Sequence, residues 1–260
     1  MLSSRLLLSL IPACFLLTAA VAKPVAKPAE APADSAAAAV IKRTLESRFP
    51  GTPIVSVTPS PIPGLYEVFT GETLVYSDKT GDHVFNGQFI DTATRTDITA
   101  QRLEAHGRID FDSLPFERAI KVVKGDGSRK IAVFADPDCP YCQKLEEQMA
   151  VLDNLTVYTF LFPLSEIHPD ATNKARAIWC AGDRSQVWEQ WMVKQKAIPP
   201  ASCAGDPVAE LRTLAKKLYI STTPTFFLDS GRRVRGAMDA AQLAKLLDEN
   251  KKGSPQSPGG

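Results

Sequence analysis

Two cysteines separated by two residues lie where an apolar strand pattern turns into a helical one. They are Cys139 and Cys142 in the stretch FADPDCPYCQKLEEQM, residues 134–149. In a helix that begins at this point, Leu145 and Met149 lie on the same face as Cys142. Polar residues point away from that face: Gln143, Lys144, Glu146 and Glu147. The pattern therefore predicts that Cys142 is buried against a core and that Cys139 is exposed in the first helical turn.

This position favours a reactive thiol at Cys139. The first turn of a helix carries free backbone N–H groups and the positive end of the helix dipole, and both stabilise a thiolate. A free cysteine has a pKa of about 8.5, and CxxC geometry can lower that pKa to neutrality or below. We predict that Cys139 is the nucleophile and that Cys142 is the thiol that resolves the mixed disulfide.

A zinc site and a purely structural disulfide are the alternatives for this pair. Zinc usually requires a second close pair of Cys or His ligands, but the histidines of this chain are scattered and its remaining cysteines lie far apart. A disulfide that closes so short a ring removes little chain entropy. A redox-active disulfide between Cys139 and Cys142, without a metal or another cofactor, is therefore the prediction.

The second cysteine pair, Cys180 and Cys203, lies in a mainly helical stretch and outside any CxxC motif. A disulfide between these residues would close a long loop, which stabilises a fold by roughly 3 kcal/mol in the chain-entropy estimate. We interpret the two residues as a structural disulfide, with a second redox pair as the alternative.

Thr223 and Pro224 open a later strand, TPTFFLD. Proline cannot donate to a strand ladder, so an ordinary edge strand is one explanation of this residue. A cis Thr223–Pro224 bond is the other, because it would leave backbone groups of the preceding residue free for a substrate chain.

The order of predicted elements from about Leu114 indicates an α/β domain. Strands are expected in AIKVV, KIAVFAD and LTVYTFLF, a helix follows the CxxC motif, and a mainly helical stretch runs from Ala171 to Tyr219. The strands TPTFFLD and RRVRG and the helix MDAAQLAKLLDEN complete the unit. Strands and helices in this order form a mixed sheet covered by helices. We expect this domain over residues 114–252 and a disordered tail over 253–260.

A smaller α+β domain is expected before it. The stretch KPVAKPAEAPADS has few groups to bury, which is typical of a disordered linker, here residues 23–36. The segment AAAAVIKRTLESRFPG predicts a helix with Ser35 as its N-cap. Short alternating segments after it predict an antiparallel sheet that the helix covers on one face. This domain spans residues 37–98, and a solvated linker helix follows within residues 99–113.

The first 22 residues are typical of a secretory signal peptide. Its features are an early cation, an apolar run and small residues before the cleavage site: Arg5, Leu6–Leu17, and Ala20 with Ala22. A membrane anchor is the alternative, but the run is shorter than the roughly 20 apolar residues that span a bilayer. Cleavage removes Cys14, so four cysteines remain, and export to the oxidising compartment beyond the membrane permits disulfides between them.

Charge gives little reason to expect a nucleic-acid partner. The whole chain has a formal net charge of +1, and loss of Arg5, the one charged residue of the first 22, lowers it to 0. A neutral chain without a basic stripe argues against nucleic acid as the main partner.

Four stretches together resemble the DsbC-type disulfide isomerases of the periplasm: VFADPDCPYCQKLEEQM, AIWCAGD, PPASC and TPTFFLDSGRRVRG. The resemblance extends over essentially the whole mature chain. It implies a thioredoxin-fold catalytic domain with a helical insertion, in which Cys139, Cys142 and a cis-proline at Pro224 serve the chemistry, and a substrate chain that lies near Thr223, Pro224 and Tyr141. It also implies a cystatin-like N-terminal domain that forms a homodimer with a cleft for misfolded proteins. The membrane reductase DsbD would keep the CxxC pair reduced.

Two departures from this family bear on function. The dipeptide between the cysteines is Pro140-Tyr141, as in the related DsbG proteins, which are similar to reductases of oxidised single cysteines, whereas the best-known isomerases carry Gly-Tyr. Thioredoxins place a buried carboxylate six residues before the first cysteine, and Val133 occupies that position here. The proton acceptor for Cys142 is thus unassigned, with Asp136 and Asp138 as the nearest acidic residues.

We predict a periplasmic protein disulfide isomerase or reductase that rearranges non-native disulfides in secreted proteins, with chaperone activity. The Cys139 thiolate forms a mixed disulfide, which resolves when the substrate thiol attacks elsewhere or when Cys142 attacks Cys139. Because Tyr141 supplies no cation, we expect a less stabilised thiolate than in an oxidase with histidine between the cysteines. The alternatives are a DsbG-like reductase with holdase activity, a holdase whose cysteines are incidental, and an oxidase.

Overall fold

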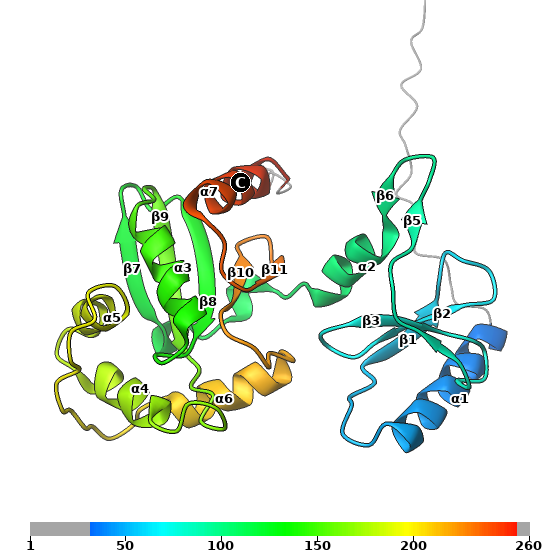
Figure 1. Cartoon of the computed structure of the whole chain (residues 1–260), viewed down its shortest axis with the longest axis horizontal. Helices are drawn as coiled ribbons and strands as arrows, with labels where there is room; N and C mark the ends of the chain where they lie inside the picture. The colour runs from blue at the N-terminus through cyan, green and yellow to red at the C-terminus, as the bar shows by residue number, and fades with distance from the viewer. Residues whose placement is uncertain (1–31, 254–260) are drawn as a thin grey trace, which may run out of the picture.

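The structure is a computed structural model that describes residues 32–253. The predicted signal peptide, most of the predicted linker and all but the first residue of the predicted tail therefore lie outside the described residues. Two units are joined through one helix (Figure 1). We call residues 32–97 the N-terminal unit and residues 109–253 the C-terminal unit. No helix within residues 32–253 is both long enough and apolar enough to cross a membrane.

The N-terminal unit is a small antiparallel sheet with one helix on it. Helix α1 (Pro32–Arg48) precedes four strands in the order β1-β2-β3-β4: β1 (Ser56–Pro59), β2 (Tyr66–Phe69), β3 (Leu74–Ser77) and β4 (Val84–Phe85). A two-stranded ribbon follows, β5 (Ile90–Asp91) with β6 (Thr96–Asp97). Ile41 and Leu45 of α1 pack against Ile54 and Val68, which forms one buried cluster. The predicted sheet with a helix on one face is confirmed.

Helix α1 begins earlier than its sequence pattern indicated. It starts at Pro32 instead of after an N-cap at Ser35, so the last residues of the segment expected to be a linker are helical. Proline fits the first helical position because its fixed φ suits the helix and its missing N–H has no partner there. Asp34 in the first turn favours the same start through the positive end of the helix dipole.

Helix α2 (Ile98–Gly107) connects the units, and Asp97 caps it by accepting a 2.8 Å hydrogen bond from the Ala100 N–H. Its prediction as a solvated helix is wrong for one face, because Arg102 reaches the fully buried carboxylate of Glu67 on β2. Arg102 Nε lies 2.8 Å from both carboxylate oxygens. Burial would raise the pKa of Glu67, but hydrogen bonds from His106 and Arg102 outweigh this effect and lower it.

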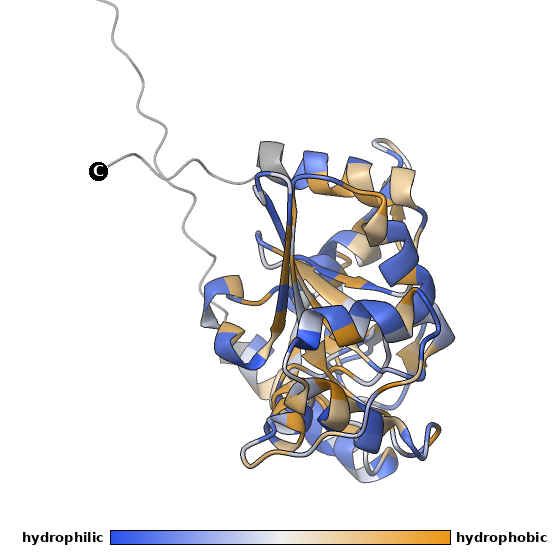
Figure 2. Ribbon diagram, turned by 90° about the vertical axis from the view of Figure 1, so that its left-hand side faces the viewer, coloured by the Kyte–Doolittle hydropathy of each residue, from blue (hydrophilic) through white to orange (hydrophobic). Residues whose placement is uncertain are grey.

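The C-terminal unit is built on a five-stranded sheet in the order β11-β10-β8-β9-β7. The strands are β7 (Ile120–Lys124), β8 (Arg129–Ala135), β9 (Leu155–Leu161), β10 (Thr225–Leu228) and β11 (Arg233–Arg235). Strands β8 and β9 are parallel, and every other pairing in this sheet is antiparallel. The mixed sheet of the predicted α/β domain is confirmed. Figure 2 shows hydrophobic segments along the strands and hydrophilic residues on the outer helices.

Five helices accompany this sheet: α3 (Pro140–Ala150), α4 (Ala171–Cys180), α5 (Arg184–Met192), α6 (Val208–Lys217) and α7 (Ala240–Gly253). Two short 3-10 turns, η1 (Phe111–Ser113) and η2 (Phe116–Arg118), lead into β7. The predicted helical stretch from Ala171 to Tyr219 is three helices, grouped on one side of the sheet in Figure 1.

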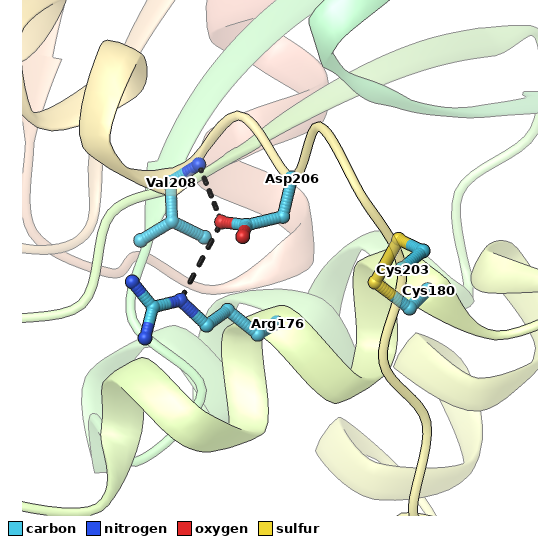
Figure 3. The surroundings of a disulfide bond; sticks show 5 residues. All are labelled: Arg176, Cys180, Cys203, Asp206 and Val208. Carbon is cyan, nitrogen blue, oxygen red and sulfur yellow. Dashed lines mark hydrogen bonds and ion pairs between the residues drawn. A yellow bond between two sulfur atoms is a disulfide. The ribbon is translucent and has the colours of Figure 1, made fainter.

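A disulfide links the long connection between α5 and α6 to the end of α4. Cys180 at the end of α4 is bonded to Cys203, 23 residues later in the sequence, with a Cα–Cα distance of 5.4 Å. Next to it, Asp206 accepts a 3.3 Å hydrogen bond from the Val208 N–H and lies 3.6 Å from Arg176 Nε of α4 (Figure 3). The disulfide and this ion pair together attach an otherwise irregular segment to α4.

The two units also contact each other through the β2–β3 turn. Glu72 accepts hydrogen bonds from the N–H and the hydroxyl of Ser221, at 2.9 and 2.6 Å. Arg233 donates to the carbonyl oxygens of Gly71 (2.9 Å) and Leu218 (2.6 Å). Gly71 has a φ of +93°, and a Cβ atom there would lie 2.4 Å from the Tyr219 side chain, so the contact depends on glycine.

Candidate active site

The CxxC motif lies at the junction of β8 and α3. Cys139 is the N-cap of α3 and Pro140 occupies the first helical position, where proline is favoured. The carbonyl oxygen of Cys139 accepts hydrogen bonds from the N–H groups of Cys142 (3.0 Å) and Gln143 (3.1 Å), which closes the first turn. Both cysteines are free thiols in the structure.

Both sulfur-bearing side chains are enclosed. Cys142 is 1% exposed, as predicted, but Cys139 is only 5% exposed, so the prediction of an exposed Cys139 is wrong. The segment that precedes β10 covers it, because the antiparallel register pairs Thr225 with Phe134 and so brings this segment to the end of β8. Cys139 Sγ lies 3.4 Å from the Thr223 carbonyl oxygen. Between the two enclosed cysteines, Pro140 and Tyr141 are exposed, and 65% of the Tyr141 surface is accessible.

The peptide bond between Thr223 and Pro224 is cis. The alternative of an ordinary edge-strand proline is thereby excluded, because β10 also lies between β8 and β11 in the sheet. The Thr223 carbonyl oxygen faces Cys139 Sγ, and the buried Thr223 hydroxyl has no hydrogen-bond partner among the described residues.

The environments of the two thiols separate their acidities. A hydrogen bond from the Cys142 thiol lowers the pKa of Cys139 to about 5, and Thr223 and the N–H groups of the first helical turn contribute to the same effect. Burial raises the pKa of Cys142 far above its ordinary value, and the neighbouring Cys139 raises it further. At neutral pH one thiolate therefore forms at Cys139, while Cys142 retains its proton.

A buried carboxylate organises the loop before the motif. Asp136 is fully buried, and its carboxylate accepts hydrogen bonds from the N–H groups of Asp138 and Leu164, both at 2.7 Å, and from Nδ1 of His168 at 2.9 Å. Asp138 is in turn paired with Lys174 of α4 at 2.7 Å. Both acidic residues named as nearest to Cys142 are thus engaged with other partners.

Glu146 does not point into solvent as its helical position suggested. Its carboxylate accepts a 2.8 Å hydrogen bond from the indole N–H of Trp188 on α5. It lines a cavity of about 430 Å³ between α3, α5 and the sheet, together with Lys124 and Met149. Burial raises the pKa of Glu146 to about 7. The expectation was wrong because α5, which the α3 sequence cannot reveal, covers this side of the helix.

Helix α5 also supports the loop that carries Cys139. The indole N–H of Trp191 donates a 2.6 Å hydrogen bond to the Pro137 carbonyl, and the ammonium of Lys174 lies 4.9 Å from the centre of the Trp191 ring. Sequence reasoning named neither Trp188 nor Trp191 as a site residue. Their spacing of three residues, which places both on one helix face, was the available signal.

No group of three or more His, Cys, Asp or Glu residues suited to a metal ion occurs within residues 32–253.

Comparison with known proteins matches both units. A family described as "Disulfide bond isomerase protein N-terminal domain" matches residues 29–100, and one described as "Thioredoxin-like domain" matches residues 116–251. A Bordetella parapertussis protein named "Probable thiol:disulfide interchange protein DsbC" is 42% identical over 80% of this chain and 73% of its own length. The chain belongs to the DsbC family. It is accordingly a thiol-disulfide oxidoreductase with a thioredoxin-fold domain.

A second named relative and a solved structure are also similar to this chain. The Escherichia coli "Thiol:disulfide interchange protein DsbC" is 31% identical over 82% of this chain and 89% of its own length. A crystal structure of a disulfide interchange protein from Neisseria gonorrhoeae superimposes with a TM-score of 0.52 at 38% sequence identity, and it covers 53% of this chain and 99% of that one.

Proposed function

We propose that this DsbC family member is a periplasmic protein disulfide isomerase that rearranges non-native disulfides in secreted proteins. The observation that carries the proposal is the arrangement of the CxxC pair: Cys139 caps α3 with Sγ 3.4 Å from the Thr223 carbonyl before the cis-proline, and Cys142 is buried behind it. In this arrangement the pKa of Cys139 falls to about 5 and that of Cys142 rises. A thiolate at Cys139 can attack a substrate disulfide, and a protonated thiol at Cys142 is slow to resolve the mixed disulfide that forms. This combination suits an enzyme whose substrate rearranges while it is bound.

The proposed reaction begins when Cys139 Sγ attacks one sulfur of a substrate disulfide. A Cys139–substrate disulfide forms, and the other substrate sulfur leaves as a thiolate. Isomerisation follows when this thiolate attacks a different substrate disulfide and a substrate thiolate then displaces Cys139. If no such attack occurs, Cys142 attacks Cys139 Sγ and its proton passes to the departing substrate sulfur. This step releases reduced substrate and leaves a Cys139–Cys142 disulfide, and it needs no other cofactor.

The substrate backbone lies along the segment before β10 in this proposal. Thr223, Pro224 and Tyr141 form the contact, because Thr223 adjoins Cys139 Sγ and Tyr141 is exposed beside it. Cys180 and Cys203 take no part in exchange and serve as a structural disulfide.

Residues 37–98 would form the homodimer, residues 99–113 the linker and residues 114–252 the catalytic domain, after removal of a signal peptide at 1–22 and ahead of a tail at 253–260. Val84 and Phe85 on β4 and Ile90 on β5 support a homodimer, since these large apolar side chains are between 42% and 50% exposed. Strand β4 is also an edge of its sheet and can pair with a second copy. The membrane reductase DsbD is the proposed electron donor.

Catalysis is tested with a protein substrate whose disulfides have been scrambled by oxidation. Pre-reduced enzyme is added in catalytic amounts without another reductant, and both the recovery of native substrate and the redox state of Cys139 and Cys142 are followed. An isomerase restores native protein over many turnovers while its CxxC pair stays reduced, and Cys142→Ser retains part of this activity while it accumulates the mixed disulfide. Cys139→Ser should be inactive. A wild type that stops after one turnover as the Cys139–Cys142 disulfide, with one thiol pair transferred to the substrate, together with complete loss of activity in Cys142→Ser, would indicate a reductase.

The DsbG-like reductase with holdase activity remains the second candidate because of the dipeptide Pro140-Tyr141. Chaperone activity is measured as suppression of aggregation of a substrate without cysteines, with the Cys139→Ser/Cys142→Ser double variant as the comparison. Equal suppression by the wild type and the double variant would show a holdase function that is independent of the thiols.

A further inference from the structure

Two histidine–aspartate pairs occur in the structure with nearly the same geometry. His168 Nδ1 lies 2.9 Å from Asp136, and His83 Nδ1 lies 3.0 Å from Asp78. Their settings differ, because the Asp136 side chain is fully buried beside the CxxC motif, whereas His83 is 88% exposed in the N-terminal unit. One pair is thus part of the active-site wall, and the other is an internal control.

His168 is joined to Cys139 through Asp136. The carboxylate of Asp136 binds the imidazole of His168 and the N–H of Asp138, while the carbonyl oxygen of Asp136 accepts a 3.2 Å hydrogen bond from the Cys139 N–H. Both the charge of this histidine and the position of the cysteine backbone therefore depend on the same residue.

His168 is the cation that compensates the buried Asp136 carboxylate, as the charged groups around it show. They come from the end of β8, the CxxC loop and the start of α4: Asp136, Asp138, Cys139, Asp170 and Lys174. Lys174 is already paired with Asp138 and Asp170. Among the described residues, His168 is the one cationic side chain within ion-pair distance of Asp136. A buried carboxylate without a cation is costly, so the imidazolium form of His168 is favoured.

We propose that His168, held as an imidazolium by Asp136, supplies the positive charge that stabilises the Cys139 thiolate. The dipeptide Pro140-Tyr141 contains no cation, and His168 provides one from the loop before α4. His168 does not touch the sulfur, so it is a positioning residue that acts through charge. The inference rests on the proposed nucleophilic role of Cys139 and is independent of which substrates are rearranged.

The electrostatic coupling has a measurable counterpart at the histidine. The Asp136 carboxylate raises the pKa of His168, and the Cys139 thiolate raises it further. Coupling between two sites is reciprocal. Oxidation to the Cys139–Cys142 disulfide removes the thiolate and must therefore lower the pKa of His168, while His83, in the other unit, is unaffected.

The first experiment compares His168→Gln with His83→Gln, which is the same change at the distant pair. Alkylation of Cys139 in the reduced full-length protein is followed by mass spectrometry as a function of pH. We expect His168→Gln to raise the pKa of Cys139 by about half to one unit, which slows alkylation at pH 5 about twofold to fivefold. His83→Gln should match the wild type. Equal Cys139 profiles in all three proteins would overturn the proposal.

The second experiment needs no substitution and so does not depend on the folding of a variant. The imidazole resonances of His168 and His83 are titrated by NMR in the dithiol and disulfide forms of the wild type. We expect a higher His168 pKa in the dithiol form and an unchanged His83 pKa. An unchanged His168 pKa would mean that the histidine has only a structural role. Neither experiment uses a protein substrate, so failure of the isomerase assay would leave both results interpretable.

Discussion

Replacement of the buried acid on α3, Glu146→Gln, should stabilise the protein at neutral pH. Glutamine can still accept the hydrogen bond from the Trp188 indole, and it removes the charge that burial disfavours. The pKa of a glutamate in an unfolded chain is about 4.3, whereas burial raises the pKa of Glu146 to about 7. As pH rises from about 4 to about 7, the unfolded chain releases this proton before the folded protein does, so the stability of the wild type falls.

The expected magnitude follows from these two pKa values. One pKa unit corresponds to about 1.4 kcal/mol, so the full difference is about 3 to 4 kcal/mol. The Glu146 side chain keeps some exposure to solvent, and its cavity is large enough to hold water. These features reduce the penalty, and we expect Glu146→Gln to gain about 2 to 3 kcal/mol above pH 7 and close to nothing at about pH 4.

Urea unfolding followed by tryptophan fluorescence reports the stability of the C-terminal unit, which contains Glu146. All three tryptophans of the chain, Trp179, Trp188 and Trp191, lie in α4 and α5 of the C-terminal unit. Glu147→Gln is the matched control, since the neighbouring Glu147 is exposed and its replacement should change little at any pH. A stability difference between Glu146→Gln and the wild type that does not increase between about pH 4 and about pH 8 would refute this prediction.

Three further predictions concern other parts of the molecule. Alkylation of Cys139 should show its inflection at about pH 5, and an inflection near the value of about 8.5 for a free thiol would contradict the described surroundings of this sulfur. Arg102→Met should cost about 2 kcal/mol at pH 7, because it removes the guanidinium paired with the buried Glu67 carboxylate and leaves only the longer contact to His106. Since the pairing lowers the pKa of Glu67, this cost should shrink as pH falls below about 4 and the carboxylate becomes protonated. If urea unfolding gives the same cost at every pH, this prediction is refuted. Gly71→Ala should destabilise the protein by about 1 kcal/mol or more, since a Cβ atom would collide with Tyr219; unchanged unfolding would show that the turn can move away.

Local pattern was sufficient to predict the elements of both units. The apolar stretches that became β8 and β9 are buried along almost their whole length, which gives each a clear strand signal. The face of α3 that carries Cys142, Leu145 and Met149 is buried as its helical period indicated. Predictions of this kind succeed because each depends on residues within one or two turns of the same element.

Predictions failed where the environment of a residue comes from a distant part of the chain. The burial of Cys139 depends on Thr223, 84 residues later. The burial of Glu146 depends on Trp188, 42 residues later, and its helical position alone could not reveal that neighbour. The sequence alone does not distinguish His168 from the other two histidines, because only the fold brings it to Asp136, 32 residues away.

Because Glu72 contacts Ser221 across the two units, one unit cannot be replaced by that of another protein without an effect on the other unit. Ser221 lies two residues before Thr223, so one side of the segment that faces Cys139 is held by the N-terminal unit. A chimaera that joins this N-terminal unit to another thioredoxin-fold domain would need three matching features on the new partner: a donor at position 221, space for a glycine turn against residue 219, and an arginine at position 233 that reaches the Gly71 carbonyl. Without these three features, the active site of the chimaera would keep its cysteines, but the backbone segment that faces the cysteines would lose its support from the N-terminal unit.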